Sequence, residues 1–141
     1  MINDGLKLKG KLAISLNGKI IQEVDNLVVT AGKGYVASRM KDTTATAMSH
    51  MAIGSGSTAA AASDTALGNQ LGRVALTSTT VSNAVVTYVA SFPAGTGTGA
   101  VTEAGILNAS SGGTMLCRTV FSVVNKGASD SMTVTWTVTV S

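Results

Sequence analysis

The alternation in residues 131–141, SMTVTWTVTVS, constrains the fold more than any other stretch of this chain. Thr or Ser stands at every odd-numbered position, and an apolar residue at every even-numbered one: Met132, Val134, Trp136, Val138 and Val140. Because successive side chains of a β-strand point to opposite faces, this pattern predicts a strand with one apolar face and one hydroxyl-bearing, uncharged face. A slip by one residue would move the whole apolar face into water, so the register should be fixed.

Turn signals recur roughly every 10 residues and separate further strand-like segments, which is typical of a β-sandwich or barrel. Asn17-Gly18 joins residues 6–16 to 19–25, and Ser82-Asn83-Ala84 joins residues 73–83 to 84–92. Ser111-Gly112-Gly113 separates residues 101–110 from 114–124. The sequence predicts a mainly β protein, an antiparallel, jelly-roll-like β-sandwich with one or two short helices.

Two segments depart from the strand pattern and are the expected helices. Residues 31–41 can place Tyr35, Val36 and Met40 on one helical face. Residues 63–71 begin with capping residues and end before a glycine, which favours a helical turn or two. A chain of 141 residues suits one domain, so we expect a single sandwich spanning residues 1–141, with residues 1–25 as an N-terminal hairpin or arm.

The composition is poor in charge. Charged residues make up 12% of the chain, about half of the usual share, while hydrophobic residues make up 45%. Such a chain is not expected to be disordered. Ala, Gly, Ser and Thr replace the charged residues, and a surface of this kind loses little hydration when a partner covers it. The pattern favours a protein that assembles with other subunits. The alternative is a β-protein that is rich in small residues and has no partner.

The net charge of +3 is concentrated in the first 41 residues. Lys7, Lys9 and Lys11 alternate with other residues in a strand-like row, and Lys19 follows the Asn-Gly turn. Such a row is compatible with nucleic-acid binding or with protection of an edge strand. We favour edge protection and expect no direct nucleic-acid partner, because no aromatic residue stands among the lysines as a stacking platform. The candidate interaction residues are these four lysines and Arg118.

No stretch of the sequence carries a complete catalytic or cofactor motif. Residues 5–12 have the spacing of a phosphate loop, but Leu12 stands where Ser or Thr should bind magnesium. Residues 27–37 outline a dinucleotide-binding turn without the acidic residue that should follow. Cys117 and His50 are a conceivable dyad, although Cys117 fits a core position better. We therefore expect no enzyme, no cofactor and no metal site.

Glu103 stands out because it lies in an otherwise apolar strand beside a glycine-rich loop. We interpret it as the partner of Arg118 in a salt bridge between neighbouring strands. With a single cysteine, no disulfide can form within the chain. No apolar run approaches the roughly 20 residues of a membrane span, and no signal sequence is evident, so no membrane partner is expected.

The segment from residue 50 to 141 resembles structural proteins of tailed bacteriophages. The resemblance rests on a set of short segments: Ile53-Gly54-Ser55-Gly56, Asp64-Thr65-Ala66-Leu67-Gly68, Gly72-Arg73, Phe92-Pro93-Ala94-Gly95, Glu103-Ala104-Gly105-Ile106-Leu107-Asn108, residues 114–121 and Thr133-Val134-Thr135-Trp136. Proteins of this kind are similar to capsid decoration, or cement, proteins, which are small β-sandwiches on the outside of the icosahedral shell.

The resemblance implies a virion structural protein that binds the major capsid protein and stabilises the head. It further implies a homodimer or homotrimer, assembled in the host cytoplasm and placed on the outer surface of the capsid. The lysine-bearing first hairpin and the loops at residues 42–62 and 94–100 are the expected contacts. The alternative is a tail, baseplate or fibre component that takes part in attachment or glycan binding.

Overall fold

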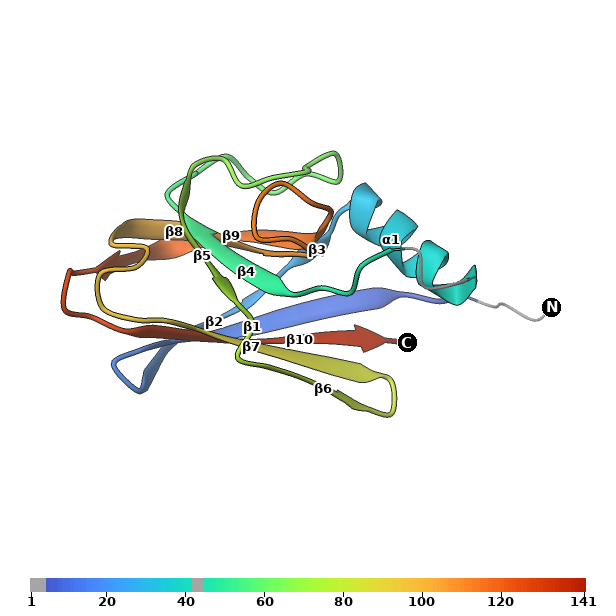
Figure 1. Cartoon of the computed structure of the whole chain (residues 1–141), viewed down its shortest axis with the longest axis horizontal. Helices are drawn as coiled ribbons and strands as arrows, with labels where there is room; N and C mark the ends of the chain where they lie inside the picture. The colour runs from blue at the N-terminus through green and yellow to red at the C-terminus, as the bar shows by residue number, and fades with distance from the viewer. Residues whose placement is uncertain (1–4, 42–44) are drawn as a thin grey trace.

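The computed structural model describes residues 5–41 and 45–141, and their strands form two antiparallel five-stranded sheets packed face to face (Figure 1). In spatial order, sheet A consists of β2 (Lys19–Asp25), β1 (Leu8–Leu16), β10 (Met132–Val140), β7 (Val85–Phe92) and β6 (Ser78–Ser82). Sheet B consists of β3 (Leu27–Val28), β9 (Met115–Lys126), β8 (Gly99–Leu107), β4 (His50–Gly54) and β5 (Gln70–Ala75). The predicted antiparallel β-sandwich is confirmed, with one helix, α1 (Thr30–Lys41), in the described part of the chain.

The alternating C-terminal segment forms β10, the central strand of sheet A. Trp136 lies opposite Leu12 of β1 on one side and opposite Tyr88 of β7 on the other. The predicted inward positions from Met132 to Val138 are buried, whereas Val140, at the end of the strand, is half-buried. The alternation therefore predicted both the strand and its inward face.

The core lies between the sheets and takes large side chains from both. Leu12, Phe92 and Trp136 contribute from sheet A, and Ile53 and Ile106 from sheet B, each of them fully buried. Burying side chains of this size stabilises the fold by about 1.5–3 kcal/mol each. Trp136 also donates from Nε1 to Oδ1 of Asn26 at 3.0 Å, which attaches β10 to the residue between β2 and β3.

Successive pairs of strands along the chain belong alternately to sheet A and sheet B. The β1–β2 and β6–β7 hairpins belong to sheet A, and the β4–β5 and β8–β9 pairs belong to sheet B. Residues 8–25, within the predicted N-terminal hairpin, are thus part of sheet A, and residues 1–4 lie outside the described residues. Asn17 and Gly18 both adopt positive φ values, 50° and 83°, as the predicted Asn-Gly turn requires.

The segment 73–83, predicted as one strand, is divided between the two sheets. Its first residues belong to β5 of sheet B and its last to β6 of sheet A. The division falls at two adjacent amides: Leu76 donates to the carbonyl of Ser49, and Thr77 donates to the carbonyl of Val89 in β7. Because neighbouring amides find acceptors in different sheets, the chain crosses between the layers at this point.

The helix predicted at residues 63–71 is absent, and this prediction is wrong. The Asp64 carboxylate accepts a hydrogen bond from the amide of Ala61 at 2.8 Å. The amides of Gly68 and Asn69 donate to the carboxylate of Glu103. Within the segment 63–71, the amides of Gly68 and Asn69 are thus bonded to Glu103 of β8 and not to carbonyls of a helix. Asp64 makes the local side-chain bond that short polar residues favour outside helices.

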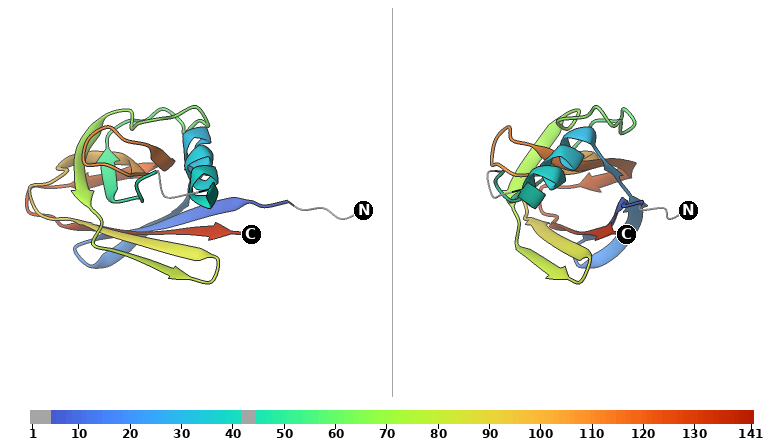
Figure 2. Two further views of the ribbon diagram at one scale, coloured as in Figure 1. Left: turned by 45° about the vertical axis from the view of Figure 1, so that its right-hand side comes forward. Right: turned by 90° about the vertical axis from the view of Figure 1, so that its right-hand side faces the viewer.

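The helix predicted at residues 31–41 is confirmed as α1, which lies across the end of the sandwich where β10 finishes (Figures 1 and 2). Tyr35 and Val36 pack against the core from this helix. Gly32 lies directly on β9, since a Cβ at this position would stand 2.1 Å from the carbonyl oxygen of Leu116. Close contact with the β9 backbone therefore fixes where the helix sits.

Candidate functional site

Three features of the surface and interior bear on function: a buried ion-pair cluster, an uncharged sheet face and a lysine-rimmed groove. The cluster centres on Glu103 of β8, which is fully buried. Its carboxylate accepts hydrogen bonds from the amides of Gly56 at 2.6 Å, Gly68 at 2.8 Å and Asn69 at 2.8 Å. Arg118 Nε donates a fourth bond at 3.1 Å. The carboxylate thus fastens both ends of the loop 55–69 to sheet B.

Arg118 of β9 completes the cluster. Its guanidinium lies 3.0 Å from Glu103 Oε1 and 2.9 Å from Asp64 Oδ2, and it donates to the carbonyl of Thr58 at 3.0 Å. The predicted salt bridge between Glu103 and Arg118 is therefore confirmed. The prediction of Arg118 as a surface contact does not fit the structure, because the residue is only 2% exposed and its donors point to internal partners.

The two carboxyl groups of the cluster are held in their ionised forms. Burial by itself raises the pKa of Glu103, but the hydrogen bonds from Asn69, Gly68, Gly56 and Arg118 outweigh it, and the pKa is lowered. The amide of Ala61 and then Arg118 lower the pKa of Asp64. Four donors occupy about as many lone-pair sites as a carboxylate offers, so Glu103 serves as a structural anchor.

The glycines of the loop let the backbone close on this carboxylate. A Cβ at Gly56 would stand 2.4 Å from Glu103 Oε2. At Gly68 a Cβ would lie 3.2 Å from the Cα of Gly56, so the absence of a side chain lets the two segments that donate to Glu103 approach each other.

The outer face of sheet A is uncharged over β6, β7 and β10, and we call this part the threonine face. Cross-strand rows run Thr135–Val89–Ser78, Thr137–Thr87–Thr80 and Thr139–Val85–Ser82, with Thr133–Ser91 at one end. Ser91 and Thr133 hydroxyls lie 3.3 Å apart. No charged side chain stands in these rows. On β1 and β2 the same face continues with charged residues: Lys9, Lys11, Glu23 and Asp25.

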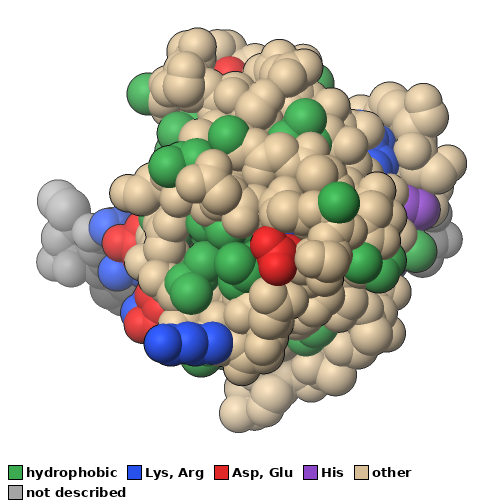
Figure 3. All heavy atoms as spheres, turned by 90° about the vertical axis from the view of Figure 1, so that its left-hand side faces the viewer, with side chains coloured by type: hydrophobic (Ala, Val, Ile, Leu, Met, Phe, Trp, Pro, Cys, Tyr) green, Lys and Arg blue, Asp and Glu red, His purple; other side chains and the backbone are tan. Residues whose placement is uncertain are grey.

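The end of the sandwich opposite α1 is also poor in charge. Figure 3 views this end and shows acidic and basic side chains next to one another at one edge of the view, with mostly hydrophobic and neutral ones elsewhere. Lys19, at the start of β2, is exposed. It lies far along β1 from Lys7 and Lys9, so the structure does not gather the four predicted lysines into one patch.

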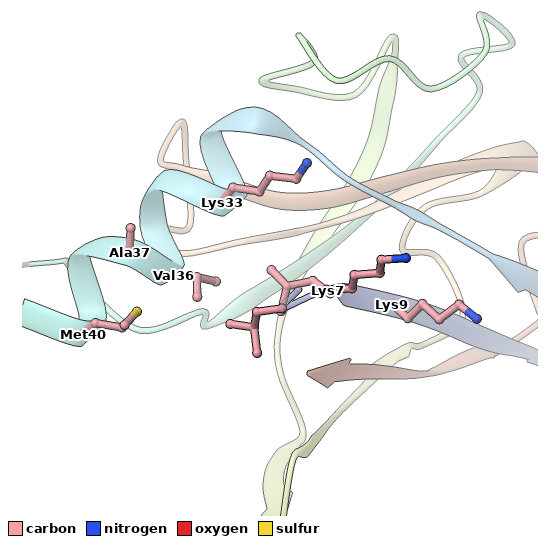
Figure 4. Close-up of a pocket in the computed structure, with 8 residues that line it drawn as sticks. Lys7, Lys9, Lys33, Val36, Ala37 and Met40 are labelled. Carbon is pink, nitrogen blue, oxygen red and sulfur yellow. The ribbon is translucent and has the colours of Figure 1, made fainter. Parts of the chain in front are cut away.

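Lys7 and Lys9 instead meet α1 at a groove, which we call the lysine groove. It has a volume of about 490 Å³ and is lined by eight residues: Leu6, Lys7, Leu8, Lys9, Lys33, Val36, Ala37 and Met40 (Figure 4). The first four come from the start of β1 and the segment before it, and the others from α1. Sequence reasoning marked Lys7 and Lys9 but missed the groove, because the approach of α1 to β1 leaves no local pattern.

The other sequence-level candidates occupy structural positions. Cys117 is fully buried in β9, and burial raises the pKa of its thiol well above the usual value. His50 of β4 is bonded through Nδ1 to the hydroxyl of its neighbour Ser49 at 2.8 Å. Residues 5–12, which have the spacing of a phosphate loop, lead into β1. Just before this strand, the amide of Lys7 donates to the carbonyl of Ser141.

Within residues 5–41 and 45–141, no three His, Cys, Asp or Glu side chains converge as a metal site would require. In the same part of the chain, α1 has 12 residues and no helix reaches the length and apolarity needed to cross a bilayer. Comparison of the chain with protein-family models, with curated proteins and with solved structures found no match.

Proposed function

We propose that this chain is a structural protein of a bacteriophage virion, a capsid decoration or cement protein. In this role it binds the major capsid protein on the outer surface of the icosahedral head, as a homodimer or homotrimer, and stabilises the head. The proposal is supported by the resemblance of residues 50–141 to phage structural proteins. The observation that carries it is the threonine face.

The threonine face suits contact with another protein because its desolvation costs little. Charged groups are costly to remove from water, and the cores of protein interfaces are accordingly poor in them. The Thr, Ser and Val side chains of β6, β7 and β10 present hydroxyl and methyl groups on a rigid sheet. A partner can cover these groups without breaking any ion pair.

The size of the face favours repeated binding. The strands β6, β7 and β10 have 5, 8 and 9 residues. With about 4.8 Å between strands and about 3.4 Å per residue, they make a patch of roughly 14 by 24 Å. A standard interface buries about 800 Å² on each partner, so one such face binds weakly alone. Many copies on a repeating lattice, or a second contact by the same molecule, raise the effective affinity. A shell of identical subunits provides that repetition.

The test places two charges on the threonine face. The Thr87→Glu/Thr135→Glu variant should fold, since a substitution on a strand surface costs about 1 kcal/mol or less. It should no longer sediment with phage heads purified from cells that make this chain. The matched control is Ser110→Glu/Ser129→Glu, which adds the same charge at exposed turn positions and should bind as the wild type does.

Electron cryomicroscopy of the same particles identifies the location. Density for the sandwich at symmetric positions on the head, with the threonine face against the shell, is the expected result. Density on the tail, baseplate or fibre would support the attachment role instead. A wild-type chain that stays free of all particles would contradict the proposal.

A further inference from the structure

The first residues of sheet A leave one strand edge open. Lys7 exchanges two backbone hydrogen bonds with Ser141, at 2.6 and 2.8 Å. Along a strand, the backbone N–H and C=O groups of successive residues point alternately to the two sides. Because those of Lys7 point toward β10, the amides and carbonyls of Leu6 and Leu8 point away from it. On that side β2 pairs with β1 only from Lys11 onward, and the amide of Asn26 binds the carbonyl of Gly10 at 3.0 Å. Among the described residues, no strand pairs with Leu6 or Leu8 at this edge.

The lysine groove lies along this open edge, with α1 as its other wall. Val36 and Ala37 each lie three or four residues from both Lys33 and Met40, so the four residues share one side of the helix. Figure 4 shows Val36 on the side of the helix that faces β1. Leu6 is 71% exposed and Met40 is 81% exposed, so the groove has large apolar side chains that no other part of the described chain covers.

The described residues that line the groove carry charge of a single sign. In Figure 4 the side chains of Lys7, Lys9 and Lys33 extend toward the same side, two from the strand and one from the helix. All eight lining residues are either apolar or lysine. The groove thus combines unpaired backbone groups at strand spacing, apolar side chains and a cationic rim.

We propose that the lysine groove takes an extended segment of a partner protein, in which apolar residues alternate with Asp or Glu. The segment adds a strand to the open edge at Leu6 and Leu8, and its carboxylates meet Lys7, Lys9 and Lys33. Strand addition of this kind obtains affinity from main-chain hydrogen bonds and specificity from the side chains. The inference rests on the proposed assembly function and supplies the second contact that the threonine face requires.

The groove favours a peptide over a nucleic acid for two reasons. A sugar–phosphate chain cannot complete a β-ladder with the open amides and carbonyls. None of the lining residues is aromatic, so the groove has no platform on which a base could stack. The open edge is also short and lies beside α1, which suits a single extended segment better than the edge of another folded sheet.

The probe for the test is an end-blocked hexapeptide of alternating Val and Glu, with a Val/Lys hexapeptide as its counterpart. The Val/Glu peptide should bind the full chain, and amide hydrogen exchange followed by NMR should show new protection at Leu6 and Leu8. The amide of Lys7, already bonded to Ser141, should change little. The Val/Lys peptide should bind at least about tenfold more weakly because its charges repel the lysine rim.

A charge-reversal variant locates the site. Lys7→Glu/Lys9→Glu should weaken binding of the Val/Glu peptide by about tenfold or more. Lys19→Glu/Ser110→Glu/Ser129→Glu changes the net charge equally at exposed residues outside the groove lining and should leave the affinity within about twofold. Thermal melting of both variants confirms that they are folded.

Several results would overturn the inference. The first is the absence of peptide binding at about 1 mM peptide. The second is protection at residues away from Leu6 and Leu8, and the third is an equal effect of the groove variant and the control variant. Displacement of the peptide by single-stranded oligothymidylate would identify a nucleic-acid site. Protection of Leu6 and Leu8 that rises with protein concentration alone would identify a second copy as the occupant. Head binding by the wild type without peptide binding would refute the groove proposal and leave the proposed function standing.

Discussion

At the residue scale, Glu103 has the greatest influence on the local structure of this chain. An ionised carboxylate is costly to bury, and this one is stable inside the protein because three amides and Arg118 donate to it. Its partners come from the loop 55–69 and from the neighbouring strand β9. Glu103 therefore anchors a loop in which Leu67 is the one large apolar side chain.

Replacing Glu103 should destabilise the protein and change its response to acid. Removing one member of a buried ion pair costs about 3–5 kcal/mol, so we expect a loss of that order for Glu103→Gln. The pKa of Glu103 is lowered in the folded chain, so its contribution is present above the unfolded value of about 4.3 and is lost as the pH falls through the folded value. Urea unfolding at a series of pH values from 7 downward measures both effects.

The variant should therefore lose less stability on acidification than the wild type does. Glu23→Gln, which removes an exposed carboxyl of β2, serves as the control for the substitution itself and should change the stability at pH 7 by much less than Glu103→Gln does. Parallel curves for wild type and Glu103→Gln would show that the buried carboxylate does not supply the acid sensitivity.

At the element scale, α1 illustrates how a weakly patterned helix is fixed by one close contact. Thr30–Lys41 contains two glycines, which lower intrinsic helix stability. Gly32 is buried against β9, whereas Gly34 is exposed and a Cβ there would meet no atom within 4 Å. The two glycines therefore have different consequences although they stand two residues apart.

Substituting each glycine by alanine should give opposite results. Gly34→Ala should raise the free energy of unfolding by about 0.5–1 kcal/mol, because alanine loses less backbone entropy in a helix. Gly32→Ala should lower it by about 1–3 kcal/mol, because the new methyl group would overlap the Leu116 carbonyl and push α1 away from β9. Thermal or urea unfolding measures both changes, and stabilisation by Gly32→Ala would contradict this packing.

The strand β10 shows how one element serves both packing and surface. Its inward side chains fill the core, and its outward threonines form the middle of the outer face of sheet A. The threonine face exists because β7 and β6 continue the same uncharged surface on one side of β10. On the other side β1 and β2 bring the charges, so the border of the face follows the β1–β10 pairing.

At the scale of the whole molecule, the proposed contacts differ in their physical character. The threonine face carries no charge, and the lysine groove is cationic. The groove lies at the end covered by α1, and Lys9 on its rim is the cross-strand neighbour of Thr139, so the two surfaces adjoin there. If the chain binds phage heads through both surfaces, one part of its affinity should fall with salt and the other part should not.

Salt should weaken head binding only partly. Raising NaCl from about 50 to about 500 mM shortens the screening length severalfold, which weakens contacts at the lysine groove and leaves the threonine face almost unaffected. Cosedimentation with phage heads should therefore show a salt-resistant remainder. The Lys7→Glu/Lys9→Glu variant should bind more weakly at low salt and lose the decrease with salt. Complete release of the wild type at high salt would indicate that charged contacts alone hold the protein on the head.

Several elements of the fold could be predicted from local sequence patterns. The alternation in β10, the Asn17-Gly18 turn and the helix at α1 depend on a few consecutive residues, and the structure confirms each of them. The ion pair of Glu103 with Arg118 followed from an acid and a base in neighbouring apolar strands. These features were predictable because side-chain period and turn chemistry are properties of the segment itself.

Other features were decided only by the tertiary structure, because they depend on contacts between residues that are far apart in the sequence. The crossing at Leu76 and Thr77 depends on acceptors in two different sheets, and within residues 63–71 the amides of Gly68 and Asn69 are bonded to Glu103 and not to carbonyls of a helix. Arg118 turned inward for the same cluster. The lysine groove arises where α1, placed by its contact with β9, approaches the start of β1. Each of these outcomes depends on groups far apart in the chain, and their meeting is determined by the packing of the two sheets.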